Sequence, residues 1–551
     1  MAFNFSISGK LVDLHQNRIF PGRITVQNGI IQRITPLEDN QAFSPVSLLP
    51  IIMPGFVDAH VHVESSMLPP TEFARMAVVH GTVGSVSDPH EIANVLGETG
   101  VIFMLENAAR SPFKSCFGAP SCVPATGFES AGATLDAKAV ARLLDRPDIG
   151  YLAEVMNFPG VLAADPELMA KIDAAKALGK PIDGHAPGLR RRDAARYAAA
   201  GIETDHECVT LEEALDKVAC GMHILIREGS AAKNFDALWP LLLSHPDRVM
   251  FCSDDKHPND LVHGHINQLV ARAVTNGAPL FDVLRAACYN PVRHYRLPIG
   301  QLRVGDPADF IAVKDLERFE VMQTWIGGRE VARHGKTLLD RVPTAAPNKF
   351  AALPLLPEQL QVAAEGAELR AIVVHDGQLV TSSAWVPTPL SGEWAVASPG
   401  DDLLKLVVYN RYQVAAPAIA FVKGFGLRQG ALASTVAHDS HNIIAVGADD
   451  KALAAAINAL VANGGGISVA DAALKTALLA LPIAGLMSDQ DGWEVAEAYE
   501  SLDTRAKALG SHLKAPYMSL SFLALLVIPS LKLSDQGLFD GEVFAFCELF
   551  R

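Results

Sequence analysis

The stretch Pro54-Gly55-Phe56-Val57-Asp58-Ala59-His60-Val61-His62 is the most informative part of this sequence. Its apolar run predicts a buried strand, and the run ends in two histidines two residues apart. Side chains alternate between the two faces of a strand, so His60 and His62 are expected to point to the same side. Two imidazoles on one face can hold one divalent metal ion. An HxH pair alone is a weak signal, so this interpretation depends on the rest of the chain.

Beyond Gly55 the sequence alternates short apolar runs with longer Ala- and Leu-rich amphipathic segments, as far as about Asn290. This alternation is typical of repeated βα units. We expect strands at 51–62, 82–87, 115–118, 150–154, 181–185, 202–206, 222–227 and 248–254. Helices are expected between them, for example at 166–178, 191–200, 211–220 and 280–287. Eight such repeats predict an α/β fold with a (β/α)8 TIM-type barrel.

The sequence on either side of the barrel predicts further domains, as the length of 551 residues also suggests. Residues 1–50 and 296–341 read as short strands and turns, and they are expected to form one small β-rich domain beside a barrel of residues 51–295. A Pro- and Ala-rich stretch at 342–357 is expected to be a linker. Residues 358–551 are expected to form a C-terminal α/β domain.

The composition restricts the class of partner. With 49% hydrophobic and 19% charged residues the chain reads as a soluble globular protein, and its net charge of −15 disfavours nucleic acid and anionic membranes. No secretory signal is visible at the start, and the longest apolar run, 522–528, is far shorter than the ~20 residues of a membrane span. Seven dispersed cysteines without a CxxC motif fit reduced thiols. We therefore expect a cytoplasmic protein with a small-molecule substrate.

Polar residues stand where most of the predicted barrel strands end, which is where barrel enzymes place their chemistry. These residues are His60, His62, Asp88 (followed by His90 and Glu91), Glu154, His185, His206 and Asp254 (followed by Asp255). Four histidines and two carboxylates at one mouth suffice for two divalent metal ions that share a bridging carboxylate and a bridging hydroxide. Such a hydroxide is nucleophilic at neutral pH, because metal binding lowers the pKa of water to about 7. This predicts hydrolysis of a carbon–nitrogen bond, with Asp254 passing a proton to the leaving group.

Other histidines fit the pattern less well. His263 and His265 form a second HxH pair, but they lie in a Gly-containing turn before a helix, and we interpret them as non-ligands. His438 and His441 lie outside the predicted barrel, and no role is assigned to them beyond a possible second site.

The motifs resemble those of the amidohydrolase superfamily, and the longer strings around them resemble one branch of it, the bacterial adenine deaminases. The matching strings lie at 54–67, 87–97, 118–126, 204–210, 227–232, 251–255, 438–442 and 481–489. They cover nearly the whole chain. The superfamily shares the HxH pair, whereas the longer strings are specific to the branch.

This resemblance implies hydrolysis of adenine to hypoxanthine and ammonia, a reaction of purine salvage, at a binuclear site. Manganese or iron is the usual metal, although Zn(II) also fits a ligand set of histidines and carboxylates. The implied ligands are His60, His62 and Asp254 for one ion, His185 and His206 for the other, and Glu154 as the bridge. The implied catalytic residues are Asp254, Glu154 and His206. Asp88, His90 and Glu91 are implied to orient the ligands, and Asp255 to contact N7 of the purine.

Two alternatives remain at this level. A related hydrolase could act on another aminopurine, such as N6-methyladenine, or on a cyclic amide with the same ligands. A non-catalytic barrel that serves in assembly would not need the complete ligand set. The large region after the barrel is also expected to supply the interface of a homo-oligomer.

Overall fold

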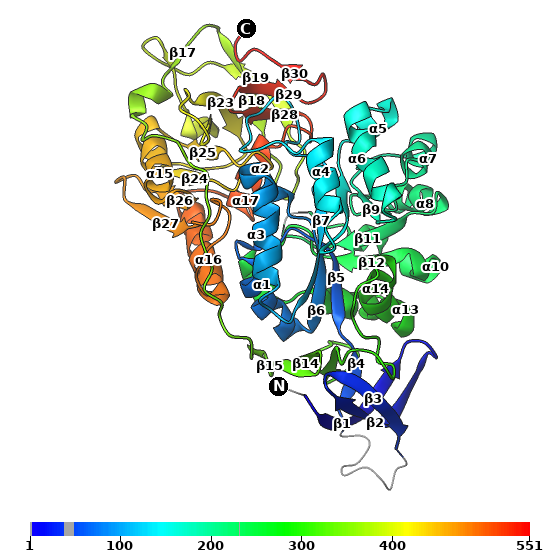
Figure 1. Cartoon of the computed structure of the whole chain (residues 1–551). Helices are drawn as coiled ribbons and strands as arrows, with labels where there is room; N and C mark the ends of the chain where they lie inside the picture. The colour runs from blue at the N-terminus through cyan, green and yellow to red at the C-terminus, as the bar shows by residue number, and fades with distance from the viewer. Residues whose placement is uncertain (1–2, 38–48, 231) are drawn as a thin grey trace.

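The computed structural model describes residues 3–37, 49–230 and 232–551 (Figure 1). Residues 1–2 and 38–48 of the β-rich segment expected over 1–50, and residue 231 of the string at 227–232, lie outside these ranges. Within the described ranges, none of the helices combines the length and the apolar character that crossing a bilayer requires.

Eight parallel strands form a barrel. Five of them pair in the order β5 (Phe56–Val61), β6 (Thr82–Ser87), β7 (Lys114–Ala119), β8 (Ile149–Val155) and β9 (Ile182–Gly184). The other three pair in the order β10 (Thr204–Asp205), β11 (His223–Arg227) and β12 (Val249–Cys252). Backbone hydrogen bonds connect the two groups at both seams, from Glu203 N to Ile182 O (2.9 Å) and from Asp254 N to His60 O (2.9 Å). The predicted α/β fold with a TIM-type barrel is confirmed.

Helices follow the strands around the barrel (Figure 1). They are α1 (Pro70–Ala77), α2 (His90–Leu96), α3 (Glu98–Ala108), α4 (Ala137–Leu144), α5 (Phe158–Ala163), α6 (Pro166–Ala177), α7 (Arg191–Ala199), α8 (Leu211–Ala219), α9 (Phe235–Leu238), α10 (Leu241–Ser244), α11 (Pro258–His263), α12 (Ile266–Thr275), α13 (Leu280–Leu284) and α14 (Asn290–His294). The side chains of Asp136, Asp165 and Thr210 accept hydrogen bonds from backbone amides in the first turns of α4, α6 and α8. These caps explain where the three helices begin.

The expectation of one strand over 51–62 is wrong. The run breaks at Gly55, so that β4 (Ile51–Pro54) joins a separate sheet and only β5 enters the barrel. Glycine is required at the junction, because a Cβ there would lie 2.3 Å from Cγ1 of Val83. The apolar pattern could not reveal the break, since every residue of both strands is buried.

Strands from before and after the barrel form one eight-stranded sheet. Its order is β16 (Lys336–Thr337), β15 (Arg329–Arg333), β14 (Val321–Ile326), β13 (Phe310–Val313), β4, β1 (Phe5–Asp13), β2 (Arg18–Gln27) and β3 (Ile30–Pro36). β4 is the centre of this assembly, because it pairs with β1 on one side and with β13 on the other.

Residues 338–356 contain neither helix nor strand, and a second mixed α/β region follows them. Its eight-stranded sheet has the order β19 (Ser382–Pro387), β18 (Glu368–Val373), β23 (Ala418–Lys423), β22 (Leu403–Tyr409), β25 (Ile443–Gly447), β24 (Ala431–Ser434), β26 (Gly466–Ala470) and β27 (Thr476–Ala480). The helices of this region are α15 (Asp450–Asn463), α16 (Gly492–Ala508) and α17 (Pro516–Ser521). Two small sheets complete it, β17 (Val362–Ala363) with β21 (Trp394–Ala395) and β20 (Leu390–Ser391), and β28 (Leu531–Ser534) with β29 (Gly537–Asp540) and β30 (Ala545–Phe546).

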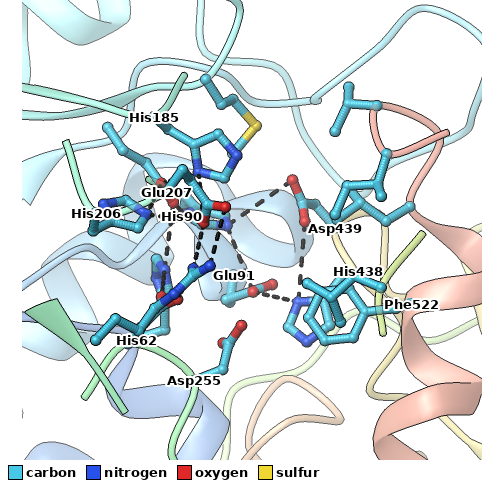
Figure 2. A pocket seen from close by; sticks show the side chains of 18 residues that line it. His62, His90, Glu91, His185, His206, Glu207, Asp255, His438, Asp439 and Phe522 are labelled. Carbon is cyan, nitrogen blue, oxygen red and sulfur yellow. Dashed lines mark hydrogen bonds and ion pairs between the residues drawn. The ribbon is translucent and has the colours of Figure 1, made fainter. Parts of the chain in front are cut away.

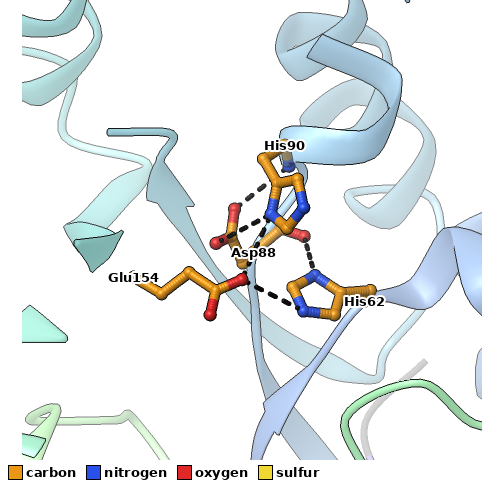
Figure 3. Close-up of side chains that lie close together, drawn as sticks. All are labelled: His62, Asp88, His90 and Glu154. Atoms are coloured by element: carbon orange, nitrogen blue, oxygen red, sulfur yellow. Dashed lines mark hydrogen bonds and ion pairs between the residues drawn. The ribbon is translucent and has the colours of Figure 1, made fainter. Parts of the chain in front are cut away.

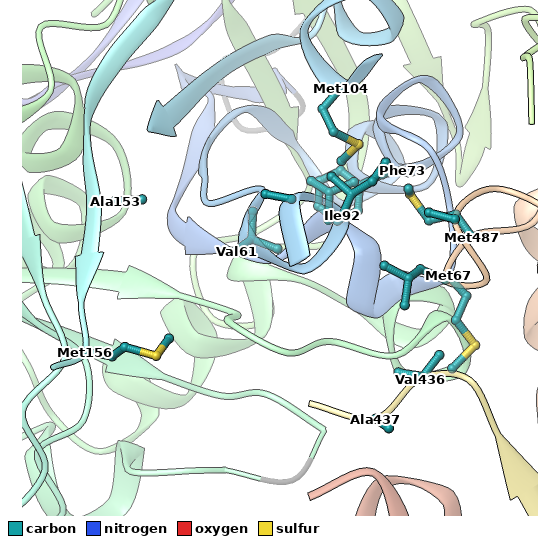
Figure 4. Packing of buried hydrophobic residues seen from close by; sticks show 14 of the residues in the cluster. Val61, Met67, Phe73, Ile92, Met104, Ala153, Met156, Val436, Ala437 and Met487 are labelled. Carbon is teal, nitrogen blue, oxygen red and sulfur yellow. The ribbon is translucent and has the colours of Figure 1, made fainter. Parts of the chain in front are cut away.

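The barrel and the C-terminal region share one hydrophobic core (Figure 4). Met67 and Ile92, which follow β5 and β6, belong to the same buried cluster as Val436 and Met487. Ser488 N also donates a hydrogen bond to Met67 O at 2.8 Å. The C-terminal region is therefore packed against the carboxyl ends of the barrel strands.

Candidate active site

The end of β5 places His60 and His62 together, as strand alternation predicts. Their Nε2 atoms lie 3.2 Å apart. Asp254, just after β12, brings Oδ1 to 3.5 Å from His60 Nε2 and 3.1 Å from His62 Nε2. All three side chains are buried, and their ligand atoms surround one point. This arrangement suits a divalent cation.

Glu154, the last residue but one of β8, lies between two sets of histidines. Its Oε2 lies 2.7 Å from His185 Nδ1 and 3.1 Å from His206 Nε2. Its Oε1 lies 3.4 Å from His62 Nε2. Burial alone would raise the pKa of Glu154, but His185 and His206 outweigh burial and hold that pKa well below its usual value. An ionised carboxylate therefore faces both sets of imidazoles.

Asp88 and His90 lie beside His62 and Glu154, close enough for the four side chains to share one metal ion (Figure 3). His90 Nδ1 is 3.2 Å from Asp88 Oδ2 and 3.4 Å from Glu154 Oε1. Together with His62 and Glu154, the two residues offer four ligand atoms within 4.8 Å of one another. The geometry thus makes Asp88 and His90 candidates for metal contact as well as for orienting the other ligands.

Buried polar atoms without a hydrogen bond indicate whether these side chains fit a metal ion. Asp88 Oδ2 and His90 Nδ1 are buried and lie 3.2 Å apart, but neither makes a hydrogen bond of acceptable geometry among the described residues. Buried polar atoms are rarely left without a partner, because the loss of hydration is costly. A cation among these oxygens and nitrogens would satisfy them, so the residues present fit the implied metal.

Arg227 and Glu207 were not identified as site residues in the sequence analysis. Arg227, the last residue of β11, donates hydrogen bonds to Asp254 and Glu207, the latter at 3.0 Å from Nη2 to Oε2. Glu207 Oε1 lies 3.5 Å from His206 Nε2. Their positions at or near strand ends were a usable signal, because the rule that found Glu154 applies equally to Arg227 and Glu207.

The turn between β24 and β25 enters the barrel mouth, so His438 and His441 lie at the same site as the barrel residues. His438 Nδ1 is 2.6 Å from Glu91 Oε1, and His441 Nε2 contacts the other oxygen of Glu91. Asp439 Oδ2 lies 4.0 Å from His90 Nε2. Nothing in the local sequence indicates that these residues meet.

In the second HxH pair, His265 is held in place by contacts with other side chains. His265 Nε2 lies 2.8 Å from Asp58 Oδ2, and its Nδ1 lies 2.7 Å from Thr82 Oγ1. Both ring nitrogens are therefore engaged, in a buried network beside β5. His263 is the last residue of α11.

A pocket opens above the cluster (Figure 2). The polar residues that line it are His62, His90, Glu91, Glu154, His185, His206, Glu207, Arg227, Asp254, Asp255, His438 and Asp439. The apolar residues that line it are Met156, Leu379, Phe522, Leu525, Val527 and Ile528. A concave site with clustered charge on one side and apolar side chains on the other suits a small heterocyclic molecule.

Comparisons with known proteins identify the family to which this chain is similar. The amidohydrolase family matches residues 51–331, and the adenine deaminase C-terminal domain matches residues 378–545. The chain is 56% identical to an adenine deaminase of Salinibacter ruber, with 100% of both chains covered. It is 53% identical to one of Sulfurovum sp. (98% of each chain) and 51% identical to one of Methanosarcina acetivorans (98% of this chain and 99% of the other). The chain belongs to the adenine deaminase family, a branch of the amidohydrolases.

Proposed function

We propose that this protein hydrolyses adenine to hypoxanthine and ammonia. The observation that carries the proposal is the position of Glu154, whose two oxygens face separate sets of imidazoles at the mouth of the barrel. Relatives named adenine deaminase match the whole chain, including the C-terminal region that completes the pocket.

We further propose that two divalent ions, Mn(II) or Fe(II), are the resident cofactors; Zn(II) is also compatible with these ligands. His60, His62 and Asp254 would hold one ion, His185 and His206 the other, and Glu154 would contact both. When bound, the ions would supply an activated water as nucleophile and positive charge for the developing negative charge.

Asp254 is suited to move the proton of the attacking water. Burial raises its pKa, but Arg227 and the rings of His60 and His62 outweigh burial and hold the pKa well below the usual value. Asp254 is therefore ionised at neutral pH. Arg227 binds Oδ2, which leaves Oδ1 directed towards His60 and His62. Oδ1 can take the proton and deliver it to the C6 amino group, which then leaves as ammonia.

Asp255 is suited to orient the ring. Ser65 Oγ donates a hydrogen bond to Asp255 Oδ1 at 2.6 Å, and the side chain lines the pocket. Burial, followed by the charge of Asp254, raises the pKa of Asp255 above its usual value. A neutral carboxyl can donate a hydrogen bond to a ring nitrogen that accepts one, such as N7 of adenine.

A spectrophotometric assay of adenine conversion, with Mn(II) or Fe(II) supplied, tests this proposal. We expect turnover of adenine, loss of activity on chelation, and recovery when either metal is restored. N6-methyladenine, a hydantoin and a dihydropyrimidine serve as competing substrates. Preferred turnover of any of these, with adenine inert, would replace the substrate assignment. Activity that persists after complete chelation would contradict the metal assignment.

We also propose that the protein acts as a homo-oligomer in the cytoplasm. All seven cysteines are free thiols, which suits a reducing compartment. Light scattering of the purified protein gives the oligomeric state directly, and a monomer at micromolar concentration would contradict this part of the proposal.

A further inference from the structure

One side of the pocket is formed by apolar side chains of the C-terminal region (Figure 2). We refer to this surface as the apolar wall, which consists of Leu379, Phe522, Leu525, Val527 and Ile528. Phe522 and Leu525 are buried in a small cluster with Met518, and the other three are partly buried against that cluster. In Figure 2, Phe522 lies across the pocket from His62 and His206.

A buried lysine ties the two segments of the apolar wall together. Lys532 Nζ donates to the carbonyl oxygen of Leu379 at 2.8 Å and to that of Phe522 at 2.9 Å. The residue is 0% exposed. Burial lowers the pKa of Lys532 to about 7. A buried amine is costly unless it is hydrogen-bonded, so these two bonds favour one arrangement of the two segments. Thr381 adds a third tie, because its Oγ1 donates to Leu531 O at 2.8 Å.

A second set of contacts fixes the apolar wall relative to the metal-binding residues. The ring of Phe522 stacks on that of His438, with centroids 4.5 Å apart and an angle of 18° between the planes. His438 in turn is bound to Glu91, which follows His90 in the first turn of α2. The position of the wall is thus coupled to the barrel through side-chain contacts.

We propose that the apolar wall determines which ring can occupy the pocket, and that Lys532 is a positioning residue for it. This inference rests on the proposed deamination of adenine. Reaction at C6 requires that carbon to lie at the cluster around Glu154, so the remote edge of the ring extends towards the wall. The five side chains carry no polar group, so they select by shape. The preferred substrates are free purine bases without substituents on that remote edge.

Substitutions in the apolar wall test its role in selection. We would measure kcat and KM of the metal-loaded Phe522→Ala and Ile528→Ala enzymes with adenine, 2-methyladenine and 9-methyladenine. We expect KM for adenine to rise about tenfold and kcat to change less than about threefold, because the wall contacts the bound ring rather than the reacting carbon. Relative to adenine, kcat/KM should rise about tenfold or more for at least one methylated base. Unchanged ratios for both bases in both variants would overturn the proposal.

Lys532→Met tests the positioning role, with Lys405→Met as its matched control. Lys405 is also a fully buried lysine of the C-terminal region, but it binds Leu360 O and Asp450, and neither of these lines the pocket. We expect Lys532→Met to reproduce the higher KM and the relaxed ratio, and Lys405→Met, once circular dichroism shows it folded, to keep the wild-type ratio. Equal effects of the two variants would show general destabilisation and overturn the role of Lys532.

Calorimetric binding of hypoxanthine supplies a readout that does not depend on turnover. Its Kd should weaken by about tenfold in Phe522→Ala and Lys532→Met, in parallel with KM for adenine. A wild-type Kd in both variants would contradict the proposed role of the apolar wall. If the wild-type enzyme fails to deaminate adenine, the proposed function is wrong. If the wild-type enzyme is active and the variants match it, the proposed function stands and only the role of the apolar wall is wrong.

Discussion

The two sides of the pocket are built in opposite ways. The barrel side consists of buried charged and imidazole groups, each held by several neighbours, as Glu154 is by His62, His185 and His206. On the C-terminal side, His438 and Asp439 also line the pocket, but the apolar wall belongs to a small separate cluster, and some of its side chains are partly exposed. Removing one member of a buried polar network leaves its partners unsatisfied, whereas apolar side chains around a substitution can repack. We therefore expect the barrel side to control kcat and the C-terminal side to control KM and selectivity.

The largest effect is expected from Glu154→Gln, because a neutral amide cannot serve both sets of imidazoles as an anionic ligand. Both ions should bind more weakly, and kcat should fall at least about 10³-fold. Metal content by elemental analysis and turnover of adenine measure the two effects. Glu106→Gln, at an exposed position of α3, is the matched control and should behave as wild type. Full metal content with full activity in Glu154→Gln would show that Glu154 is not a metal ligand.

Asp254→Asn should separate chemistry from metal binding. The amide retains one oxygen as a ligand but cannot accept the proton, so we expect most of the metal to remain while kcat falls about 10²- to 10⁴-fold. The same two measurements apply. Loss of both ions, as extensive as in Glu154→Gln, would show that Asp254 acts mainly as a ligand.

Glu91→Gln tests the connection between the two sides of the pocket. A carboxylate can accept hydrogen bonds from both His438 and His441, whereas the single oxygen of an amide pairs well with only one of them. We expect kcat/KM for adenine to fall about tenfold, mainly through KM, because the contact acts on the apolar wall. A drop in kcat as large as that of Asp254→Asn, at unchanged KM, would instead place Glu91 in the chemistry.

The smallest effect concerns the pH dependence of stability at the boundary between the two regions. Glu129 is buried with one oxygen unpartnered among the described residues, and burial, then Asp439, raises its pKa from 4.5 to about 8. The folded protein therefore binds this proton more tightly than the unfolded chain does. Its stabilising contribution is complete below pH 4.5 and is lost as the pH rises through about 8.

Glu129→Gln should remove that dependence, because the amide does not titrate. From pH 5 to 8.5 the Tm of the wild type should fall relative to that of the variant by about 2 °C or more, as calorimetry can measure. Parallel Tm curves across this range would show that Glu129 is already ionised in the folded protein.

Features of this protein that depend on neighbouring residues could be predicted from the sequence. Strand alternation placed His60 and His62 on one face, and the ends of four further barrel strands identified Glu154, His185, His206 and Asp254. Short-range periodicity and strand ends are properties of a few consecutive residues, so they can be read without knowing the rest of the fold.

The other features of the fold and the site depend on contacts between residues far apart in the chain. The need for glycine at position 55 comes from Val83 of the next strand, and the contacts of Glu91 with His438 and His441 join residues 347 and 350 positions apart. The apolar wall exists because the C-terminal region packs on the barrel mouth. Such contacts are set by how two folded regions dock, and no local pattern of apolar and polar residues encodes that docking.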